Sequence, residues 1–325
     1  MQQPKNLKEN YSLKRLNSWR VGGEARYFAT PSSVDELKAL LLWASFYKIV
    51  VFILADGTNL LISDKPLEGL VIGLKKLRTS TEEIKEIENK KDISSLSFSL
   101  LSGTPKNDLF SICLKQHLSA SIFLAGLPGS VGGGVVMNAG VGFDVCPKEF
   151  KDIVDWVEVL SFNPEDKSFK KTQYKKSELL WGYRSCKNWQ SNKNNANKDI
   201  ITKVGFCFSS KEFDKPLKQK QVIENKVQEA QVFRKTKQPV NTFNCGSVFK
   251  NPKGYSAGAL IDECGLKLAS VGGASVSQLH ANFIVAEKGT KSTDIFLLIK
   301  KIQNTVLEKK NIALNLEVKL MGSFN

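Results

Sequence analysis

The stretch LAGLPGSVGGGVVMNAGVG, residues 124–142, contains seven of the chain's 23 glycines. Its other residues are mostly apolar, whereas a flexible linker would be rich in polar residues such as Ser. Glycine removes side chains, so main-chain N–H groups can approach a ligand, and a nest of such donors suits phosphate oxygens. The stretch predicts a buried site lined by backbone. The alternative, that these glycines only make turns or allow close helix packing, stays open for this stretch taken alone.

A second stretch, LADGTNLL at residues 54–61, follows the apolar run 49–53 and predicts a strand that enters a tight turn. Neither stretch is a familiar nucleotide motif. LPGSVGGG lacks the Lys-Ser/Thr ending of a P-loop, and ADGTN is not the GxGxxG of a dinucleotide-binding unit. Two such loops in one chain nevertheless predict a large anionic ligand.

The composition is that of an enzyme-sized globular protein, with 325 residues of which 42% are hydrophobic. The first 15 residues hold no apolar stretch of signal-peptide length, and no run approaches the roughly 20 apolar residues of a membrane span. We therefore expect a cytoplasmic protein without a membrane partner. Separately, a monomer is expected.

The net charge of +15 would also suit a nucleic-acid-binding protein. The lysines are dispersed, however, without the helix patterning or aromatic interleaving of a nucleic-acid surface. A solvated basic face is the simpler interpretation, so no nucleic-acid partner is expected.

Cysteine and histidine exclude several kinds of site. The six cysteines show no CxxC spacing, which argues against a zinc site and against a dense disulfide framework. The chain has only two histidines, His117 and His280, which excludes a multi-His metal centre and disfavours a Ser-His-Asp hydrolase. No metal site is predicted.

Hydrophobic periodicity and cap residues predict helices and strands in mixed order. The predicted helices span 34–47, 107–117, 213–235, 258–263 and 292–309, with a charged helix or turn at 81–91. The predicted strands span 49–54, 69–74, 96–101, 154–162, 167–172, 202–208, 281–285 and 314–320. The apolar face of the helix 213–235 is expected to consist of Val222, Val227, Ala230 and Phe233. The Asn/Lys-rich segment 187–198 is predicted to be a disordered surface loop.

As a pair and in this order, the two glycine-bearing stretches resemble the flavin domain of the UDP-N-acetylenolpyruvoylglucosamine reductase family. The resemblance continues in collinear order over nearly the whole chain. Its further segments are NSWRVGGEARYFATPSSVDEL (17–37), GYR (182–184), CGSVFKNP (245–252), AGALIDECGLKLASVGGASVSQLHANFI (257–284) and LEVKLMG (316–322). It implies an α+β fold with a two-subdomain, PCMH/vanillyl-alcohol-oxidase-like FAD-binding half, at 1–78 and 79–212, and a C-terminal α+β substrate domain at 213–325.

The resemblance also implies a reaction. NADPH reduces a non-covalently bound FAD, and the reduced flavin passes hydride to the enolpyruvyl double bond of UDP-N-acetylglucosamine enolpyruvate, giving UDP-N-acetylmuramate for peptidoglycan. Hydride adds to the terminal methylene carbon, so negative charge develops on the neighbouring carbon and spreads into its carboxylate. Such chemistry needs preorganised positive charge at the carboxylate and a proton source for the carbanion.

Three residues match the family's catalytic positions. Arg184 would offer a planar fork to the substrate carboxylate, as a Lys could not. Ser247 would be the proton donor, and Glu317 would help to organise the enolate or the donor hydroxyl. Without the resemblance, each has a plainer interpretation: a surface ion pair, a turn residue and a solvent-facing carboxylate.

The resemblance also implies binding residues. For FAD these are Gly57, Thr58, Asn59, Gly126, Gly129, Ser130, Gly133, Asn138 and Arg234. For the UDP part of the substrate they are Lys237, Lys250 and Asn251.

The chain departs from the family pattern at several places. Ala55 stands where glycine is usual, which is tolerable if its φ is negative, and Asp56 places a carboxylate near a pyrophosphate, so we expect it to point outward. Residues 141–143, Val-Gly-Phe, replace the usual Ala-Tyr-Gly. No Tyr-bearing insertion is evident between residues 208 and 233, which places the chain near the subgroup without a tyrosine lid.

Two other interpretations stay open. A flavin oxidase or dehydrogenase acting on an alcohol or sugar would share the FAD domain, but it would not explain Ser247 and Glu317 in their segments. A nucleic-acid-binding protein without enzymatic activity would carry no flavin colour.

Overall fold

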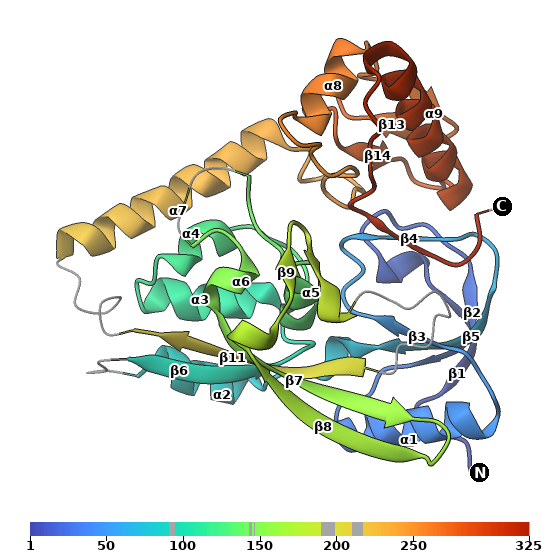
Figure 1. Cartoon of the computed structure of the whole chain (residues 1–325), viewed down its shortest axis with the longest axis vertical. Coiled ribbons are helices and arrows are strands. Elements are labelled where there is room, and N and C mark those ends of the chain that lie inside the picture. The colour runs from blue at the N-terminus through green and yellow to red at the C-terminus, as the bar shows by residue number, and fades with distance from the viewer. Residues whose placement is uncertain (91–94, 143–144, 146, 190–198, 210–216, 325) are drawn as a thin grey trace. The chain divides into compact units, whose positions relative to one another are not determined.

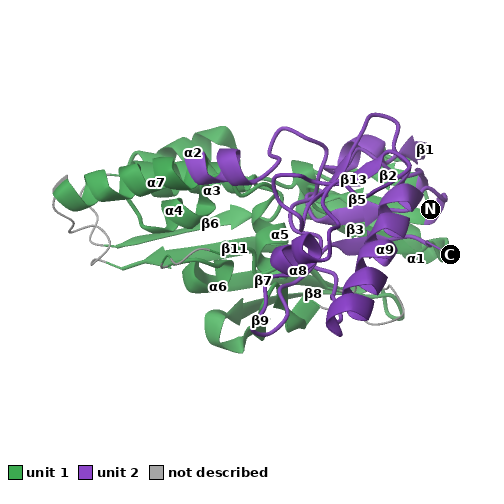
Figure 2. Cartoon of the chain, turned by 90° about the horizontal axis from the view of Figure 1, so that it is seen from above, with its two compact units in different colours: residues 1–8, 27–56, 69–231 green, residues 9–26, 57–68, 232–325 purple. Residues whose placement is uncertain are grey.

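The computed structural model describes residues 1–325 except 91–94, 143–144, 146, 190–198, 210–216 and 325. The chain divides into two compact units (Figure 2). Unit 1 consists of residues 1–8, 27–56 and 69–231, and unit 2 of residues 9–26, 57–68 and 232–325. The predicted domains at 1–78, 79–212 and 213–325 are contiguous in sequence, whereas these units are not, so that division stays a prediction. Most of the segment predicted as a disordered loop, and the start of the predicted helix 213–235, lie outside the described residues.

The larger sheet of unit 1 is antiparallel (Figure 1). Its strands, in spatial order, are β6 (Leu96–Leu101), β11 (Asp199–Phe208), β7 (Val154–Asn163) and β8 (Ser168–Lys175). The helices α2 (Thr81–Glu88), α3 (Lys106–Lys115) and α4 (Ala120–Leu124) share a hydrophobic core with it. The strands predicted at 154–162 and 167–172 are confirmed, and they form a hairpin in which Asn163, at the end of β7, pairs with Ser168, at the start of β8.

A second sheet has the order β1 (Lys8–Ser12), β2 (Glu24–Ala29), β5 (Leu67–Gly73) and β3 (Val51–Leu54). In unit 1, β3 runs parallel to β5, and α1 (Val34–Phe46) packs its Leu37 and Leu40 into their core. The side chain of Ser33 caps α1 by accepting from the Glu36 N–H at 3.1 Å. The predicted helix 34–47 is therefore confirmed, with its last helical residue at Phe46.

The glycine-rich stretch does not fold as the predicted loop throughout. Val131–Val136 form a short helix, α5, which begins after Ser130. A Cβ at Gly132 would lie 2.7 Å from the Ser102 Cβ, and one at Gly134 would collide with the Phe150 ring. These two glycines therefore allow close helix packing, which was the alternative interpretation.

The long helix α7 (Leu217–Lys237) confirms only part of the predicted apolar face, namely Val227 and Ala230. Ile223, Val227 and Ala230 are buried in unit 1, at the spacing of one helical stripe. Val222 and Phe233 are 49% and 48% exposed, so their assignment to the apolar face was wrong.

Unit 2 is built on the helices α8 (Ala257–Glu263) and α9 (Ser292–Lys310) and a sheet of β12 (Ser270–Val271), β13 (Ala274–Val276) and β14 (Ile284–Ala286). Asp64 caps α9, because its carboxylate accepts from the N–H groups of Ser292 at 3.0 Å and Thr293 at 2.9 Å. None of the helices in the described part of the chain is long and apolar enough to cross a membrane.

The closing strand is shorter than predicted. Only Lys319–Met321 form β15, which pairs in parallel with β4 (Leu60–Ile62). Upstream of β15, the N–H groups of Glu317 and Val318 both donate to the Val248 carbonyl, so the backbone bends toward another segment instead of continuing the ladder. The predicted strand 281–285 is also displaced, to Ile284–Ala286.

Candidate active site

In unit 1, a two-stranded hairpin carries Arg184. Its strands are β9 (Trp181–Gly182) and β10 (Ser185–Cys186), and Gly182 pairs with Ser185 across the turn. Arg184 has a φ of +51°, a left-handed conformation that costs a non-glycine residue about 1–2 kcal/mol. Its guanidinium carbon lies 5.1 Å from the centre of the Tyr183 ring. The turn therefore holds Arg184 in a conformation that an unconstrained arginine would avoid.

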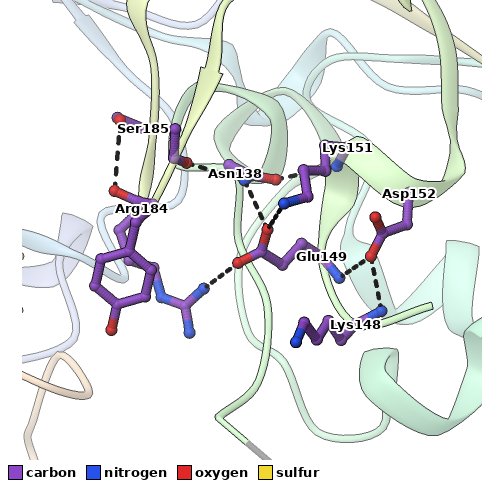
Figure 3. Close-up of polar contacts among 9 residues, drawn as sticks. Asn138, Lys148, Glu149, Lys151, Asp152, Arg184 and Ser185 are labelled. Carbon is purple, nitrogen blue, oxygen red and sulfur yellow. Dashed lines mark hydrogen bonds and ion pairs between the residues drawn. The ribbon is translucent and has the colours of Figure 1, made fainter. Parts of the chain in front are cut away.

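The Arg184 guanidinium meets a buried carboxylate. Its Nη1 lies 3.5 Å from Oε1 of Glu149, and the two side chains are only 11% and 10% exposed (Figure 3). The other carboxylate oxygen of Glu149 lies 2.9 Å from Nζ of Lys151, and this contact raises the pKa of Lys151. Glu149 was missed from the sequence, where it is one charged residue in the charged stretch 148–152 and no local pattern singles it out.

Asn138 connects this ion pair to the hairpin. Its Nδ2 donates to Oε2 of Glu149 and to the Gly182 carbonyl, each at 3.0 Å, and its Oδ1 accepts from the Lys151 N–H at 3.0 Å (Figure 3). The residue is fully buried. Asn138 was predicted to bind FAD. Its side chain is engaged by the chain's own groups, and a contact of its main chain with FAD stays a prediction.

The glycine-rich segment presents backbone and small side chains. Gly126 and Gly129 have φ values of +75° and +100°, and Ser130 caps α5 by accepting from the Gly133 N–H at 3.4 Å. A Cβ at Gly133 would lie 3.6 Å from the Ala55 Cβ, so the two predicted loops approach each other here. Removing side chains at the meeting of two loops is what close approach of a large cofactor requires.

The two departures in the first loop have different outcomes. Ala55 is not among the residues with positive φ, so it fits where glycine is usual. Asp56 does not point outward as expected. It is half-buried, and burial raises the pKa of its carboxyl, while the charges of Lys75 and Lys106 act to lower it. These two cations partly offset the negative charge that we expected to face solvent.

In unit 2, Gly57 is fixed by the segment that precedes β2. It has a φ of +64°, and a Cβ there would collide with the Leu16 carbonyl. The Ser18 N–H donates to the Gly57 carbonyl at 3.2 Å. Cys245 is buried beside the same loop, its Sγ 3.5 Å from the Leu60 carbonyl, and burial raises its pKa to about 12. The thiol therefore stays protonated and unreactive at neutral pH.

Three predicted residues of unit 2 lie on adjoining segments. The Glu317 N–H donates to the carbonyl of Val248, which directly follows Ser247, at 2.9 Å. The Asn59 Nδ2 donates to the Glu317 carbonyl at 3.1 Å. The residue Ser247 is half-buried, as are Asn59 and Glu317. The fold thus brings together residues that lie 258 positions apart in the sequence.

Positive charge gathers at the same place. Lys250 is anchored by its N–H to the Asn315 carbonyl at 2.8 Å, and Lys319 by its N–H to the Asn59 carbonyl at 3.1 Å. Burial and the charge of Lys250 lower the pKa of Lys319, whereas the Glu317 carboxylate acts to raise it. The two ammonium groups and the carboxylate are therefore close enough to influence one another.

Asn282 clamps the segment that follows Ser247. Its Oδ1 accepts from the Phe249 N–H at 2.9 Å, its Nδ2 donates to the Phe249 carbonyl at 2.8 Å, and its own carbonyl accepts from the Val248 N–H at 2.9 Å. The residue is 4% exposed. Asn282 was not singled out from the sequence, although it lies within the segment 257–284 that carries the resemblance.

The remaining predicted residues are not joined to these groups by the contacts above. Arg234 is half-buried near the end of α7, and burial lowers its pKa, while Lys237 is exposed. Thr58 is half-buried, and the Asn251 Oδ1 accepts from the Ala257 N–H at the start of α8, at 3.0 Å. In all, unit 1 holds Gly126, Gly129, Ser130, Gly133, Asn138 and Arg184, and unit 2 holds Gly57, Thr58, Asn59, Arg234, Lys237, Ser247, Lys250, Asn251 and Glu317.

Comparison with known proteins assigns the family. An FAD binding domain model matches residues 25–163, and the model of the UDP-N-acetylenolpyruvoylglucosamine reductase C-terminal domain matches residues 238–321. A UDP-N-acetylenolpyruvoylglucosamine reductase from Trichormus variabilis is 36% identical over 318 residues, covering 98% of this chain and 87% of the relative. The chain belongs to the UDP-N-acetylenolpyruvoylglucosamine reductase family. Another member, from Caldanaerobacter subterraneus, is 34% identical and covers 96% of this chain and 93% of its own.

A solved structure of this reductase family supports the same conclusion. The crystal structure of the reductase from Thermus caldophilus superposes with a TM-score of 0.70 at 30% identity, covering 97% of this chain and 98% of its own. Together with the two domain matches, it confirms the predicted α+β fold with an FAD-binding part and a C-terminal domain characteristic of the reductases.

Proposed function

We infer that this chain catalyses the FAD-dependent, NADPH-driven reduction of UDP-N-acetylglucosamine enolpyruvate to UDP-N-acetylmuramate, a step in the synthesis of peptidoglycan precursors. The observation that carries the inference is similarity to named reductases along 98% of the chain, with 36% identity. The match of residues 25–163 to an FAD binding domain supports FAD as the cofactor. We propose in addition that the enzyme is a cytoplasmic monomer of the subgroup without a tyrosine lid.

The glycine-rich segment fits a bound flavin nucleotide. When bound, FAD supplies the hydride that adds to the terminal methylene carbon of the enolpyruvyl group. Gly126, Gly129, Ser130 and Gly133 offer backbone and small side chains in unit 1, and Gly57, Thr58, Asn59 and Arg234 are the proposed FAD residues of unit 2. Lys75 and Lys106 reduce the cost of placing Asp56 near an anionic cofactor, since their charges act against its own.

Arg184 is the proposed partner of the substrate carboxylate. Negative charge spreads into that carboxylate as hydride arrives, so a fixed guanidinium stabilises the transition state more than the ground state. The left-handed turn and the ion pair with Glu149 hold the guanidinium before substrate binds. Preorganisation of this kind removes the need to reorient the charge during the reaction.

Ser247 is the proposed proton donor. A hydroxyl is a weak acid in water, but neighbouring cations stabilise the alkoxide that is left when the proton moves to the carbanion. The main chains of Lys250 and Lys319 are hydrogen-bonded to Asn315 and Asn59, and their ammonium groups are the proposed source of this positive charge. Glu317, on the adjoining segment, is proposed to orient the donor hydroxyl or the enolate. Lys237, Lys250 and Asn251 are the proposed contacts to the UDP part.

The test is a pair of absorption measurements on the purified, FAD-reconstituted protein under anaerobic conditions. NADPH should bleach the flavin bands, and UDP-N-acetylglucosamine enolpyruvate should then restore them with formation of UDP-N-acetylmuramate. Bleaching by an alcohol or sugar, without restoration by the enolpyruvyl substrate, would identify a flavin oxidase or dehydrogenase instead. A protein that takes up no flavin would contradict both.

A further inference from the structure

We propose that Glu149 is a positioning residue for Arg184: it fixes the orientation of the guanidinium and ties the hairpin that carries it to the glycine-rich segment. This inference rests on the proposed function, because it takes Arg184 as the group that binds the substrate carboxylate. Glu149 itself touches neither substrate nor cofactor in this proposal and acts only through Arg184.

The buried charge of Glu149 is compensated by its neighbours. The residue is 7% exposed, and a buried carboxylate is stable only when it is paired and hydrogen-bonded. Here one oxygen lies 3.5 Å from Arg184 Nη1, and the other lies 2.9 Å from Lys151 Nζ and accepts from Asn138 Nδ2 at 3.0 Å (Figure 3). The Glu149 carboxylate thus faces two cations, of which Lys151 is also influenced by the charge of Asp152.

The backbone of Glu149 is itself fixed by neighbouring residues. Its backbone bridges to that of Gly140, and its N–H donates to Asp152 Oδ2 at 3.0 Å. The next residue, Phe150, donates its N–H to the Ala139 carbonyl at 3.0 Å. A residue with so little backbone freedom can serve as an anchor for a longer and more flexible side chain.

Asn138 also links Glu149 to the hairpin that carries Arg184. Asn138 donates one amide hydrogen to Glu149 and the other to the Gly182 carbonyl, two residues before Arg184. The carboxylate therefore reaches Arg184 twice, directly at the guanidinium and indirectly through the strand that leads into the turn. Since bidentate recognition depends on the plane of the guanidinium, a change at Glu149 should disturb its orientation while its charge remains.

The test is Glu149→Gln, which removes the charge and nearly preserves the shape. Reoxidation of the reduced flavin by the enolpyruvyl substrate should slow by about tenfold, since small misplacements of a reacting group cost one to two orders of magnitude. Flavin reduction by NADPH should keep its rate, and kcat should fall by a larger factor than KM rises. Glu149→Asp keeps the charge and should recover part of the loss. If Glu149→Gln does not fold, Glu149→Asp measured in both half-reactions carries the test, with slowing of the second only.

Glu88→Gln is the matched control. Glu88 is another buried carboxylate of unit 1, and its side chain accepts from Ser111 Oγ at 2.6 Å and pairs with Lys115 instead of with the groups around Arg184. Its loss should lower stability but keep both half-reaction rates within about twofold of the wild type. The proposal is overturned if Glu149→Gln slows both half-reactions equally, if it slows neither, or if Glu88→Gln slows the second half-reaction as much.

Arg184→Lys separates this proposal from the proposed function. If Arg184→Lys leaves the rate of the second half-reaction unchanged, Arg184 does not bind the substrate carboxylate as proposed. Glu149 would then have no catalytic guanidinium to position. If Arg184→Lys slows that step but Glu149→Gln does not, only the positioning role fails. In the Arg184→Lys background, Glu149→Gln should add less than about twofold, because residues that act through one another are not additive. Full additivity would contradict the proposal.

Discussion

Arg184 and Ser247 are held in two different ways. Arg184 depends on side chains, since its guanidinium is fixed by the Glu149 carboxylate and its hairpin by the Asn138 amide. The segment of Ser247 is held through its own backbone groups, because the Val248 carbonyl accepts from the Glu317 N–H and the N–H and carbonyl of Phe249 bond to the Asn282 side chain. A substitution at position 247 should therefore reduce activity and leave the local structure intact. Substitutions around Arg184 should change both activity and local structure.

The largest expected effect is on the backbone-held side. Ser247→Ala should slow reoxidation of the flavin by the enolpyruvyl substrate by about 10²-fold, the typical contribution of a positioned general acid. Flavin reduction by NADPH should be unchanged, because it needs no proton from Ser247. Stopped-flow absorbance measures both steps, and solvent deuterium in recovered substrate would report hydride return from an unquenched carbanion.

Ser256→Ala is the control for that variant. Ser256 lies in the same unit and caps α8 by accepting from the Ala259 N–H at 3.3 Å, so its loss should lower stability and leave both half-reaction rates alone. Equal slowing of the two half-reactions in Ser247→Ala would show that Ser247 is structural or holds the flavin, and its role as proton donor would be wrong.

Asn282→Ala asks whether the Ser247 segment really depends on its clamp. The substitution leaves the N–H and the carbonyl of Phe249 without the partners that they have now, and it should lower the free energy of unfolding by about 2 kcal/mol. Denaturant titration measures the loss. Asn315→Ala is the control, since Asn315 is exposed and contributes its main-chain carbonyl to the same region. A loss equal to that of the control would mean that backbone bonding alone holds the segment.

Arg184→Lys probes the side-chain-held side. A lysine keeps the charge but cannot make a bidentate contact, so turnover should fall at least about tenfold, equivalent to about 1.4 kcal/mol. Steady-state kinetics with the enolpyruvyl substrate measures it. Arg26→Lys, at an exposed ion pair with Glu68, should change turnover little. A smaller fall for Arg184→Lys than tenfold would remove the case for a guanidinium fork.

The smallest expected effect concerns the cap of α9 by Asp64. Burial raises the pKa of Asp64, but hydrogen bonds from Thr293 and Ser292 outweigh it and hold the pKa below its usual value. A lowered pKa in the folded state means that the contribution is present at neutral pH and is lost as the pH falls from the unfolded value of about 4 through the lower folded value. Asp64→Ala should therefore cost about 1 kcal/mol at pH 7 and progressively less on acidification.

Thermal unfolding of the wild type and Asp64→Ala, measured at a series of pH values, checks the predicted pH dependence of this stability loss. Asp35→Ala serves as the control, because the Asp35 side chain is 91% exposed and its ion pair with Lys38 should contribute little. A cost for Asp64→Ala that does not depend on pH would show that the carboxylate charge plays no part in the cap.

Local patterns in the sequence predicted much of the fold. The helix α1 has an apolar stripe and a serine cap, and the hairpin of β7 and β8 has alternating residues around an Asn-Pro turn, so both follow from neighbouring residues. The glycine helix α5 could not be predicted in this way, since glycine disfavours helix by about 1 kcal/mol per residue relative to alanine. Its structure depends on packing against Ser102 and Phe150, which lie outside the glycine-rich stretch 124–142 in the sequence.

Site residues could be predicted where they lie in sequence segments that resemble the family. Ser247 and Glu317 lie on adjoining segments as the resemblance requires, although their roles remain predictions. Glu149 could not be found, because its importance depends on a contact with Arg184, 35 positions away, and not on its neighbours. Asn138 was found for its place in a glycine motif and was assigned a ligand, whereas the fold engages it in internal hydrogen bonds.

The glycine helix has a consequence for how this sequence can vary among descendants. Its three consecutive glycines have different clearances: a methyl group at 132 or 134 meets Ser102 or the Phe150 ring, whereas one at 133 finds ordinary van der Waals distances to Ser130 and Ala55. Tolerance of substitution should therefore differ among residues 132, 133 and 134. Alanine at 133 meets no short contact within the chain, so a bound flavin would be its remaining obstacle, whereas alanine at 132 or 134 requires Ser102 or Phe150 to move.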